Sequence, residues 1–130
     1  MAASVQNVKV VFIRQKGYHD LRAWMADPNN VYVGRSGVVF VKEADGTQRR
    51  WPPQESVWCN PFKVGRDGSR EEVLDQFETL LATRLEASPA LRDELIKLEG
   101  KHLGCWCKPE GCHGDVLTKA ISAEAVRRAS

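Results

Sequence analysis

The sequence has no stretch of about 20 apolar residues, which is the length that a membrane-spanning helix requires. It also has no marked excess of one charge, because its 130 residues carry a formal net charge of +2, too little to indicate nucleic-acid binding by itself. The N-terminal segment, MAASVQNVK, lacks the basic flank and apolar core of a secretory signal peptide. We therefore expect a cytoplasmic protein with no membrane partner.

Internal repeats and low-complexity segments are absent as well, which excludes solenoid and disordered architectures. Apolar residues make up 42% of the chain and charged residues 28%, the composition of an ordinary soluble globular domain. A chain of this length can bury one core of ordinary size. We expect residues 1–130 to form a single domain.

Paired C-x2-C motifs, which are typical of many structural zinc sites, are missing from the four cysteines. In a reducing compartment, clustered cysteines are more often metal ligands or reactive groups than disulfides. A bond between Cys105 and Cys107 would be strained, because residues so close in sequence rarely reach disulfide geometry. The cysteines are therefore expected to be reduced.

The pattern of apolar residues predicts alternating strands and helices. Continuous β-branched runs indicate buried strands at residues 8–13 and 31–33, with a short helix between them. Residues 102–107 form a third predicted strand, short and rich in sulfur. Because strand–helix–strand units place both strands parallel in one sheet, we expect a small three-layer α/β domain with a central, largely parallel sheet flanked by helices.

Turn and capping residues locate the remaining elements. Asp45-Gly46 predicts a β-hairpin, and residues 51–68, with three prolines, predict a long irregular loop. Three helices are expected after this loop, and they begin near residues that favour a helix N-terminus: Ser69 with Glu72 as a capping box, Ser88-Pro89, which should run to Gly100, and Cys112.

The segment CWCKPEGCHGD, residues 105–115, holds three cysteines and a histidine. In a strand Cys105 and Cys107 would point to one face, and the proline and glycine that follow can return Cys112 toward it. Zinc prefers four sulfur or nitrogen ligands in a tetrahedron. One interpretation is therefore a zinc site with Cys105, Cys107, Cys112 and His113 as ligands, or with Cys59 or His102 as the fourth. The structural alternative is that these cysteines pack as small apolar residues.

A second interpretation places Cys112 and His113 at the start of a helix that follows a strand. The N–H groups and positive end of such a helix favour an anion and lower the pKa of a thiol. Cys112 would then act as a nucleophile or His113 as an acid–base group, and we include Asp115 among the candidate catalytic residues. Gly114 would leave room for the ligand. The structural alternative is that His113 caps the helix and Asp115 complements its dipole.

The loop containing NPFKVGRDG, residues 60–68, would complete this site. Asn60 offers an amide to a base or sugar edge, and Arg35 follows the second strand. Lys63, Arg66 and Arg70 offer charge to a phosphate. We expect Asn60 and His113 to line one cavity, with Arg35 at its edge. The structural alternative is that Asn60 only makes a turn and that the basic residues are solvated.

The combination NPF…CWC.P..CHGD resembles a family of small domains of unknown function from bacteria, phages and some eukaryotes, over about residues 31–121. The resemblance brings no activity with it, and in that family a small residue often takes the position of Cys59, which disfavours Cys59 as a ligand. The family pattern is carried by these residues: Gly34, Arg35, Asn60, Pro61, Phe62, Gly65, Arg70, Cys105, Cys107, Pro109, Cys112, His113, Gly114 and Asp115.

Our first hypothesis is a domain that binds a small phosphorylated or nucleotide-like ligand at the Cys112-His113 helix start, either as a binding domain or as a hydrolase or transferase. We assign no cofactor to it. The alternative is a zinc-stabilised interaction or nucleic-acid-binding module that uses the cysteine cluster, with zinc as its cofactor. A thiol redox protein is disfavoured, because such proteins use C-x-x-C rather than C-x-C.

Overall fold

The central sheet consists of three parallel strands in the order β1-β5-β2. The structure is a computed structural model that describes residues 3–106 and 112–130. Its strands are β1 (Ser4–Asn7), β2 (Asn30–Tyr32) and β5 (His102–Cys105), and both β1 and β2 pair with β5. The predicted parallel α/β fold is confirmed, with β5 inserted between the two strands of the first strand–helix–strand unit.

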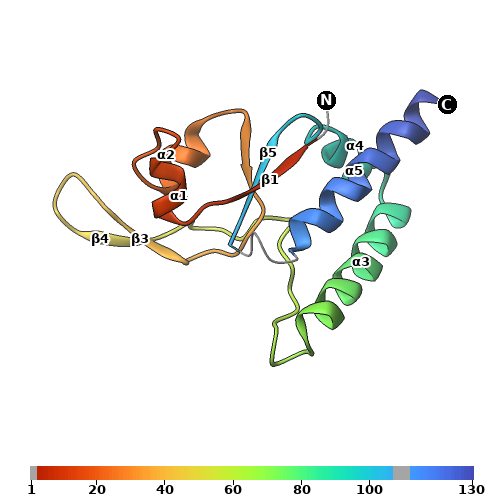
Figure 1. The fold of residues 1–130 in the computed structure, drawn as a ribbon, viewed down its shortest axis with the longest axis horizontal. Helices are drawn as coiled ribbons and strands as arrows, with labels where there is room; N and C mark the ends of the chain where they lie inside the picture. The colour runs from red at the N-terminus through yellow and green to blue at the C-terminus, as the bar shows by residue number, and fades with distance from the viewer. Residues whose placement is uncertain (1–2, 107–111) are drawn as a thin grey trace.

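Helices cover both faces of this sheet, as predicted (Figure 1). The alternation of side chains along β5 shows the division, because Leu103 and Cys105 belong to one core and Gly104 faces Trp24 in the other. The first face carries α3 (Arg70–Ala87), α4 (Pro89–Ile96) and α5 (His113–Ala129). The second face carries α1 (Val10–Arg14) and α2 (Leu21–Ala26).

The predicted hairpin is present and projects from one end of the molecule (Figure 1). It is a separate antiparallel pair, β3 (Val39–Lys42) and β4 (Gln48–Trp51). Its turn is fixed by the Asp45 carboxylate, which accepts hydrogen bonds from the backbone N–H and the hydroxyl of Thr47 at 2.9 and 2.6 Å. Gly46 adopts a φ of +89°, which glycine allows without strain.

The strand predicted at residues 8–13 is wrong. The strand lies earlier, at Ser4–Asn7, and Val10–Arg14 form a short helix. The Asn7 side chain accepts a hydrogen bond from the Lys9 N–H at 2.9 Å, a turn that leads the chain out of the sheet. Of the apolar run, only Val8 and Ile13 are buried, so the run is not packed on two faces as a central strand would be.

Helices α3, α4 and α5 begin where the sequence predicts. The differences from the prediction lie at the ends of the elements. Ser69 and Glu72 form the expected capping box, and Ser88 caps α4. Helix α4 ends at Ile96, before Gly100, and β5 ends at Cys105, whereas Cys107 of the predicted strand lies outside the described residues. Among the described residues, no helix combines the length and apolar character needed to cross a membrane.

Candidate functional site

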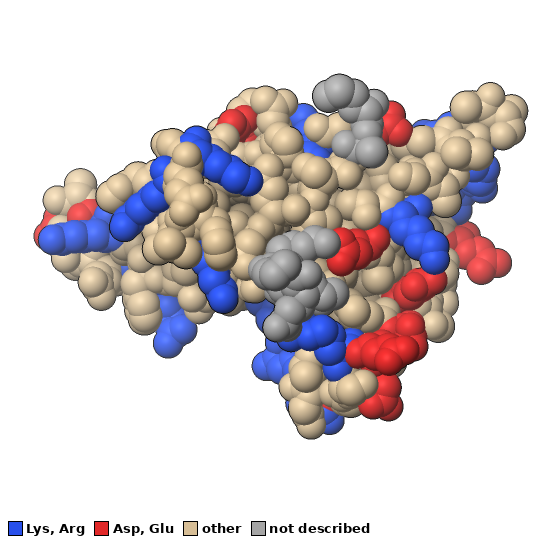
Figure 2. All heavy atoms as spheres, in the orientation of Figure 1, with Lys and Arg blue, Asp and Glu red and all other residues tan. Residues whose placement is uncertain are grey.

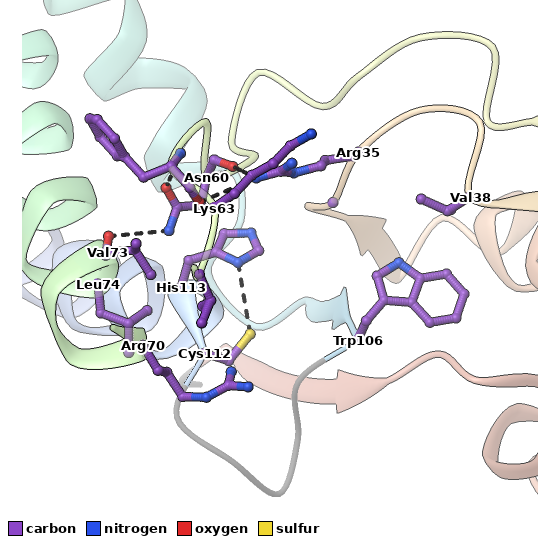
Figure 3. A pocket seen from close by; sticks show the side chains of 13 residues that line it. Arg35, Val38, Asn60, Lys63, Arg70, Val73, Leu74, Trp106, Cys112 and His113 are labelled. Atoms are coloured by element: carbon purple, nitrogen blue, oxygen red, sulfur yellow. Dashed lines mark hydrogen bonds between the residues drawn. The ribbon is translucent and has the colours of Figure 1, made fainter. Parts of the chain in front are cut away.

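A cavity of about 300 Å³ opens at the carboxyl ends of β2 and β5. Open α/β sheets commonly bind ligands at this edge. Residues after β2, in the irregular loop, and at the starts of α3 and α5 converge on the cavity (Figure 3). The residues that line it are Gly34, Arg35, Val38, Asn60, Phe62, Lys63, Val64, Arg70, Val73, Leu74, Trp106, Cys112 and His113.

His113, the first residue of α5, has both ring nitrogens in contact with protein atoms. Its Nε2 lies 2.6 Å from the carbonyl oxygen of Val33, and its Nδ1 lies 3.8 Å from Sγ of Cys112. Because a carbonyl oxygen can only accept, Nε2 carries the proton and Nδ1 the lone pair. Burial lowers the pKa of His113 below its usual value, and the hydrogen bond to Val33 offsets this only in part. The imidazole is therefore neutral near pH 7.

Cys112 is the N-cap of α5 and is only 1% exposed. Its sulfur accepts a hydrogen bond from the Gly114 N–H at 3.4 Å, and its own N–H donates to the Asp115 carboxylate at 3.2 Å. This reciprocal capping satisfies N–H groups that an anion would otherwise bind. The geometry thus favours a structural role for the helix start, but the cap is Cys112 and not His113 as the structural alternative had it: Cys112 and Asp115 close the helix end. It does not favour a nucleophile, which needs access to its substrate.

Gly114 serves the packing of α5 rather than the cavity. A Cβ at this position would lie 2.8 Å from Cγ1 of Val5 in β1. Glycine therefore lets α5 approach the sheet, and Gly114 is not among the residues that line the cavity.

Asn60 and Arg35 hold the irregular loop in place. The Asn60 amide donates to the Val73 carbonyl at 3.3 Å and accepts from the Phe62 N–H at 2.9 Å. The Arg35 guanidinium donates through Nη2 to the carbonyls of Asn60 and Phe62 at 2.8 and 3.2 Å. The structure therefore brings Arg35, Asn60 and His113 to one cavity, and it gives the first two a structural task there as well.

Lys63 and Arg66 differ although they share the loop. The backbone of Lys63 is fixed by Asp67, while its side chain lines the cavity and forms no ion pair with any described residue. Arg66 turns away, donating to the Asp67 carboxylate at 2.9 Å and to the Pro61 carbonyl at 3.0 Å. Of the three predicted phosphate contacts, Lys63 and Arg70 line the cavity and Arg66 does not.

The sequence interpretation missed Trp106 and Val38 as lining residues. The Trp106 N–H donates to the Tyr32 hydroxyl at 2.8 Å, and this hydroxyl donates to the Arg35 carbonyl at 2.8 Å. These bonds fix the indole beside Arg35. The available signal was the position of Trp106 directly after a buried strand, on the face opposite Cys105.

A metal centre is not evident within residues 3–106 and 112–130, where no three His, Cys, Asp or Glu side chains are grouped as ligands. Cys105 and Cys112 lie in the same buried core. Cys59 lies beside Glu55, at 3.8 Å, and burial raises the pKa of its thiol. Cys107 lies outside the described residues, so the zinc set that includes it remains a prediction.

Two curated relatives are similar to part of the chain. An "Uncharacterized 12.4 kDa protein in nrdA-td intergenic region" of Enterobacteria phage T4 is 37% identical over 68 residues, which cover 52% of this chain and 61% of the relative. An uncharacterised protein of Acanthamoeba polyphaga mimivirus is 32% identical over 75 residues, covering 52% of this chain and 54% of the relative. The chain thus spans less than two thirds of either relative. No solved structure matches it.

A family match covers most of the chain. Residues 17–123 match the family described as "Domain of unknown function (DUF4326)", a span that begins before the resemblance noted at residues 31–121. The phage and viral relatives agree with the predicted distribution of the family. The chain therefore belongs to the DUF4326 family of domains of unknown function.

Proposed function

We propose that the cavity binds a small phosphorylated or nucleotide-like ligand. The observation that carries the proposal is the pairing of unneutralised cations with an apolar wall in one cavity. Neither Arg35 nor Lys63 forms an ion pair with a described residue. An anionic group of a ligand would therefore pair with Arg35 and Lys63 without displacing a protein carboxylate.

The two sides of the cavity suit two parts of one ligand. Arg35 and Lys63 lie together on one side of His113, and Trp106 and Val38 lie on another (Figure 3). A planar guanidinium can bind phosphate oxygens in pairs, and an ammonium adds a point charge. Trp106 offers an aromatic surface to a base. A volume of about 300 Å³ suits a compact ligand, at the lower end of small-molecule sites.

The proposal is of binding and includes no chemical step. A hydrolase or transferase would need His113 to release Val33 or Cys112, or would need the buried Cys112 thiol to become accessible. Binding requires neither change. Enzymatic activity would thus need a rearrangement of the helix start in addition to the ligand site proposed here.

The test is calorimetric titration with nucleoside monophosphates, with the unphosphorylated nucleosides and inorganic phosphate as comparators. Lys63→Gln should lower the affinity for the nucleotide about tenfold or more, because a hydrogen bond to a charged group is lost. Lys119→Gln is the matched control, since Lys119 is 80% exposed on α5 and outside the cavity. Absence of binding by every nucleotide, or equal effects of the two variants, would contradict the proposal.

A double-mutant cycle tests whether residues of the loop and of the α5 helix start bind the same ligand. Asn60→Ala and His113→Ala should each weaken binding of the same nucleotide. The combined effect on the binding free energy should be less than additive if both side chains contact one group of the ligand.

Metal analysis of the purified protein tests the alternative. One equivalent of zinc would favour the zinc-stabilised module over the ligand site.

A further inference from the structure

The hairpin presents an aromatic residue among cations on its open face. In the β3–β4 register, Phe40 pairs with Arg50 and Lys42 pairs with Gln48, and side chains two apart on a strand share a face. Phe40 is 61% exposed, and the Arg50 guanidinium lies 5.0 Å from the centre of its ring. An exposed phenyl ring held beside an arginine is a surface on which a planar group can stack.

Cations without carboxylate partners lie on and around the hairpin. We call residues 9–16 and the hairpin, residues 39–51, the basic lobe. Its cations are Lys9, Arg14, Lys16, Lys42, Arg49 and Arg50, of which Arg49 pairs with Val41 and lies on the other face of the hairpin. Its carboxylates are already engaged, Glu43 by Arg22 at 3.3 Å and Asp45 by Thr47. None of these six forms an ion pair with a residue in the described part of the chain. Figure 2 shows Lys and Arg side chains around the end that the hairpin forms, with acidic side chains at its tip.

A hollow of about 430 Å³ joins the two parts of the lobe. It lies between α1 and β3, where Lys9, Val10 and Arg14 face Val39 and Phe40. The carboxylate in its lining, Asp20, accepts the hydrogen bond that caps α2, from the Ala23 N–H at 2.9 Å. The hollow therefore combines apolar walls with positive charge.

We propose that the basic lobe binds single-stranded nucleic acid. Proteins that bind single strands combine cations for the phosphates with exposed aromatic side chains on which bases stack, and the lobe supplies both. Bases in a duplex are stacked on one another and cannot reach Phe40. A membrane surface is disfavoured, because α1 has only five residues and offers little apolar length to insert. The lobe is distinct from the phosphate side of the cavity and does not depend on the function proposed for it.

The experiment is fluorescence anisotropy with labelled oligothymidylate and oligouridylate, which separate DNA from RNA, at salt concentrations from about 50 to about 200 mM. Binding should weaken as salt rises. In the variant Lys42→Gln/Arg50→Gln, which removes the two cations on the face of Phe40, the slope of log affinity against log salt should fall by about 0.7 for each phosphate contact removed. Phe40→Ala should weaken binding at least about fivefold through lost stacking.

Matched controls keep the result interpretable. Val126→Ala removes an equally exposed apolar side chain from α5, and Lys119→Gln removes a cation there; neither should alter binding. Lys63→Gln should also leave oligonucleotide binding intact, which separates this proposal from the cavity. The proposal is overturned if neither oligonucleotide binds at low salt, if Phe40→Ala binds like Val126→Ala, or if anionic phospholipid vesicles bind with the same dependence on Phe40 while oligonucleotides do not.

Discussion

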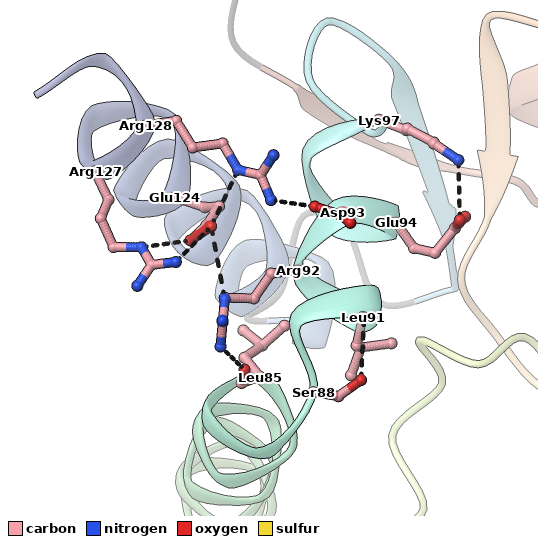
Figure 4. Close-up of polar contacts among 10 residues, drawn as sticks. All are labelled: Leu85, Ser88, Leu91, Arg92, Asp93, Glu94, Lys97, Glu124, Arg127 and Arg128. Atoms are coloured by element: carbon pink, nitrogen blue, oxygen red, sulfur yellow. Dashed lines mark hydrogen bonds and ion pairs between the residues drawn. The ribbon is translucent and has the colours of Figure 1, made fainter.

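The two faces of the central sheet differ in how their charged side chains are paired. On the face covered by α3, α4 and α5, the buried Glu124 carboxylate contacts Arg92, Arg127 and Arg128, at 4.0, 3.2 and 3.1 Å, and Arg128 also reaches Asp93 at 2.7 Å (Figure 4). On the face covered by α1 and α2, Arg22 pairs with Glu43 at 3.3 Å, while the six cations of the basic lobe have no carboxylate partner among the described residues. The first face thus gathers cations around a buried carboxylate.

The difference indicates where stability and where binding are expected to reside. Burial would raise the pKa of Glu124, but the hydrogen bonds from Arg128 and Arg127 outweigh it, and the pKa lies below its usual value. This carboxylate is thus ionised and committed to joining α4 and α5. The proposed ligand cavity lies at the strand ends, where residues from both faces meet, with Cys112 and His113 from the first and Trp106 from the second.

The largest expected contrast comes from two phenylalanines. Phe77 of α3 is 2% exposed and packs against His113, so Phe77→Ala should lower the free energy of unfolding by about 3–5 kcal/mol. Phe40→Ala should change it by no more than about 0.5 kcal/mol, because Phe40 lies on the surface of the hairpin. Urea denaturation of both variants measures the two values. Similar losses would show that the lobe is as much a part of the stabilising core as α3 is.

A smaller loss is expected where β5 meets α2. A Cβ at Gly104 would come within 3.0 Å of both the Trp24 ring and Cγ1 of Val8. Gly104→Ala should therefore cost about 1–3 kcal/mol through overpacking, measured by urea denaturation. Because the clash involves Val8, the double variant with Val8→Ala should be less destabilised than the sum of the two single changes. Strict additivity would show that Trp24 alone takes up the strain.

Much of this fold follows from local sequence signals. The capping box at Ser69, the proline after Ser88 and the Asp45-Gly46 turn each act within a few residues, and the elements that they predict are present. The strand predicted at residues 8–13 failed for the opposite reason. A run of β-branched residues does not specify whether both of its faces will be covered, and the turn at Asn7 directs it out of the sheet.

The sequence predicts where the candidate site lies, but it does not predict which contacts each of its residues makes. Parallel strands and a helix start predict that Arg35, Asn60 and His113 meet, because the ends of neighbouring strands share one edge. Which hydrogen bonds these side chains make depends on distant carbonyls, such as Val33 for His113 and Val73 for Asn60. No spacing in the sequence encodes those partners. The contact of Gly114 with Val5 is likewise a product of the packing of α5 on β1.

The charge contrast itself can be tested through Glu124. Because its folded pKa is lowered, its contribution to stability is present above the unfolded pKa and is lost as the pH falls through the folded value. Glu124→Gln should therefore lower the Tm at pH 7 and flatten the loss of stability below about pH 4.5. The effect should be modest, since Arg127 and Arg128 remain solvated. Lys42→Gln, in the lobe, should leave both the Tm and the acid limb unchanged.

The smallest expected effect is the pH dependence contributed by His113, at the junction of the two faces. Its folded pKa lies below the unfolded value of about 6.5, because burial disfavours the imidazolium. Above that pH both states are neutral at this residue, so it contributes no pH dependence. As the pH falls below about 6.5, the unfolded chain takes up a proton first, and stability decreases until the folded pKa is passed. His113→Gln should remove this component, whereas His19→Gln, at an exposed position, should retain it. Urea denaturation from about pH 7.5 to about pH 5 measures the slopes. An unchanged slope in His113→Gln would mean that the imidazole protonates as readily in the folded protein as in the unfolded chain, and the neutral, Val33-bonded form described here would then be wrong.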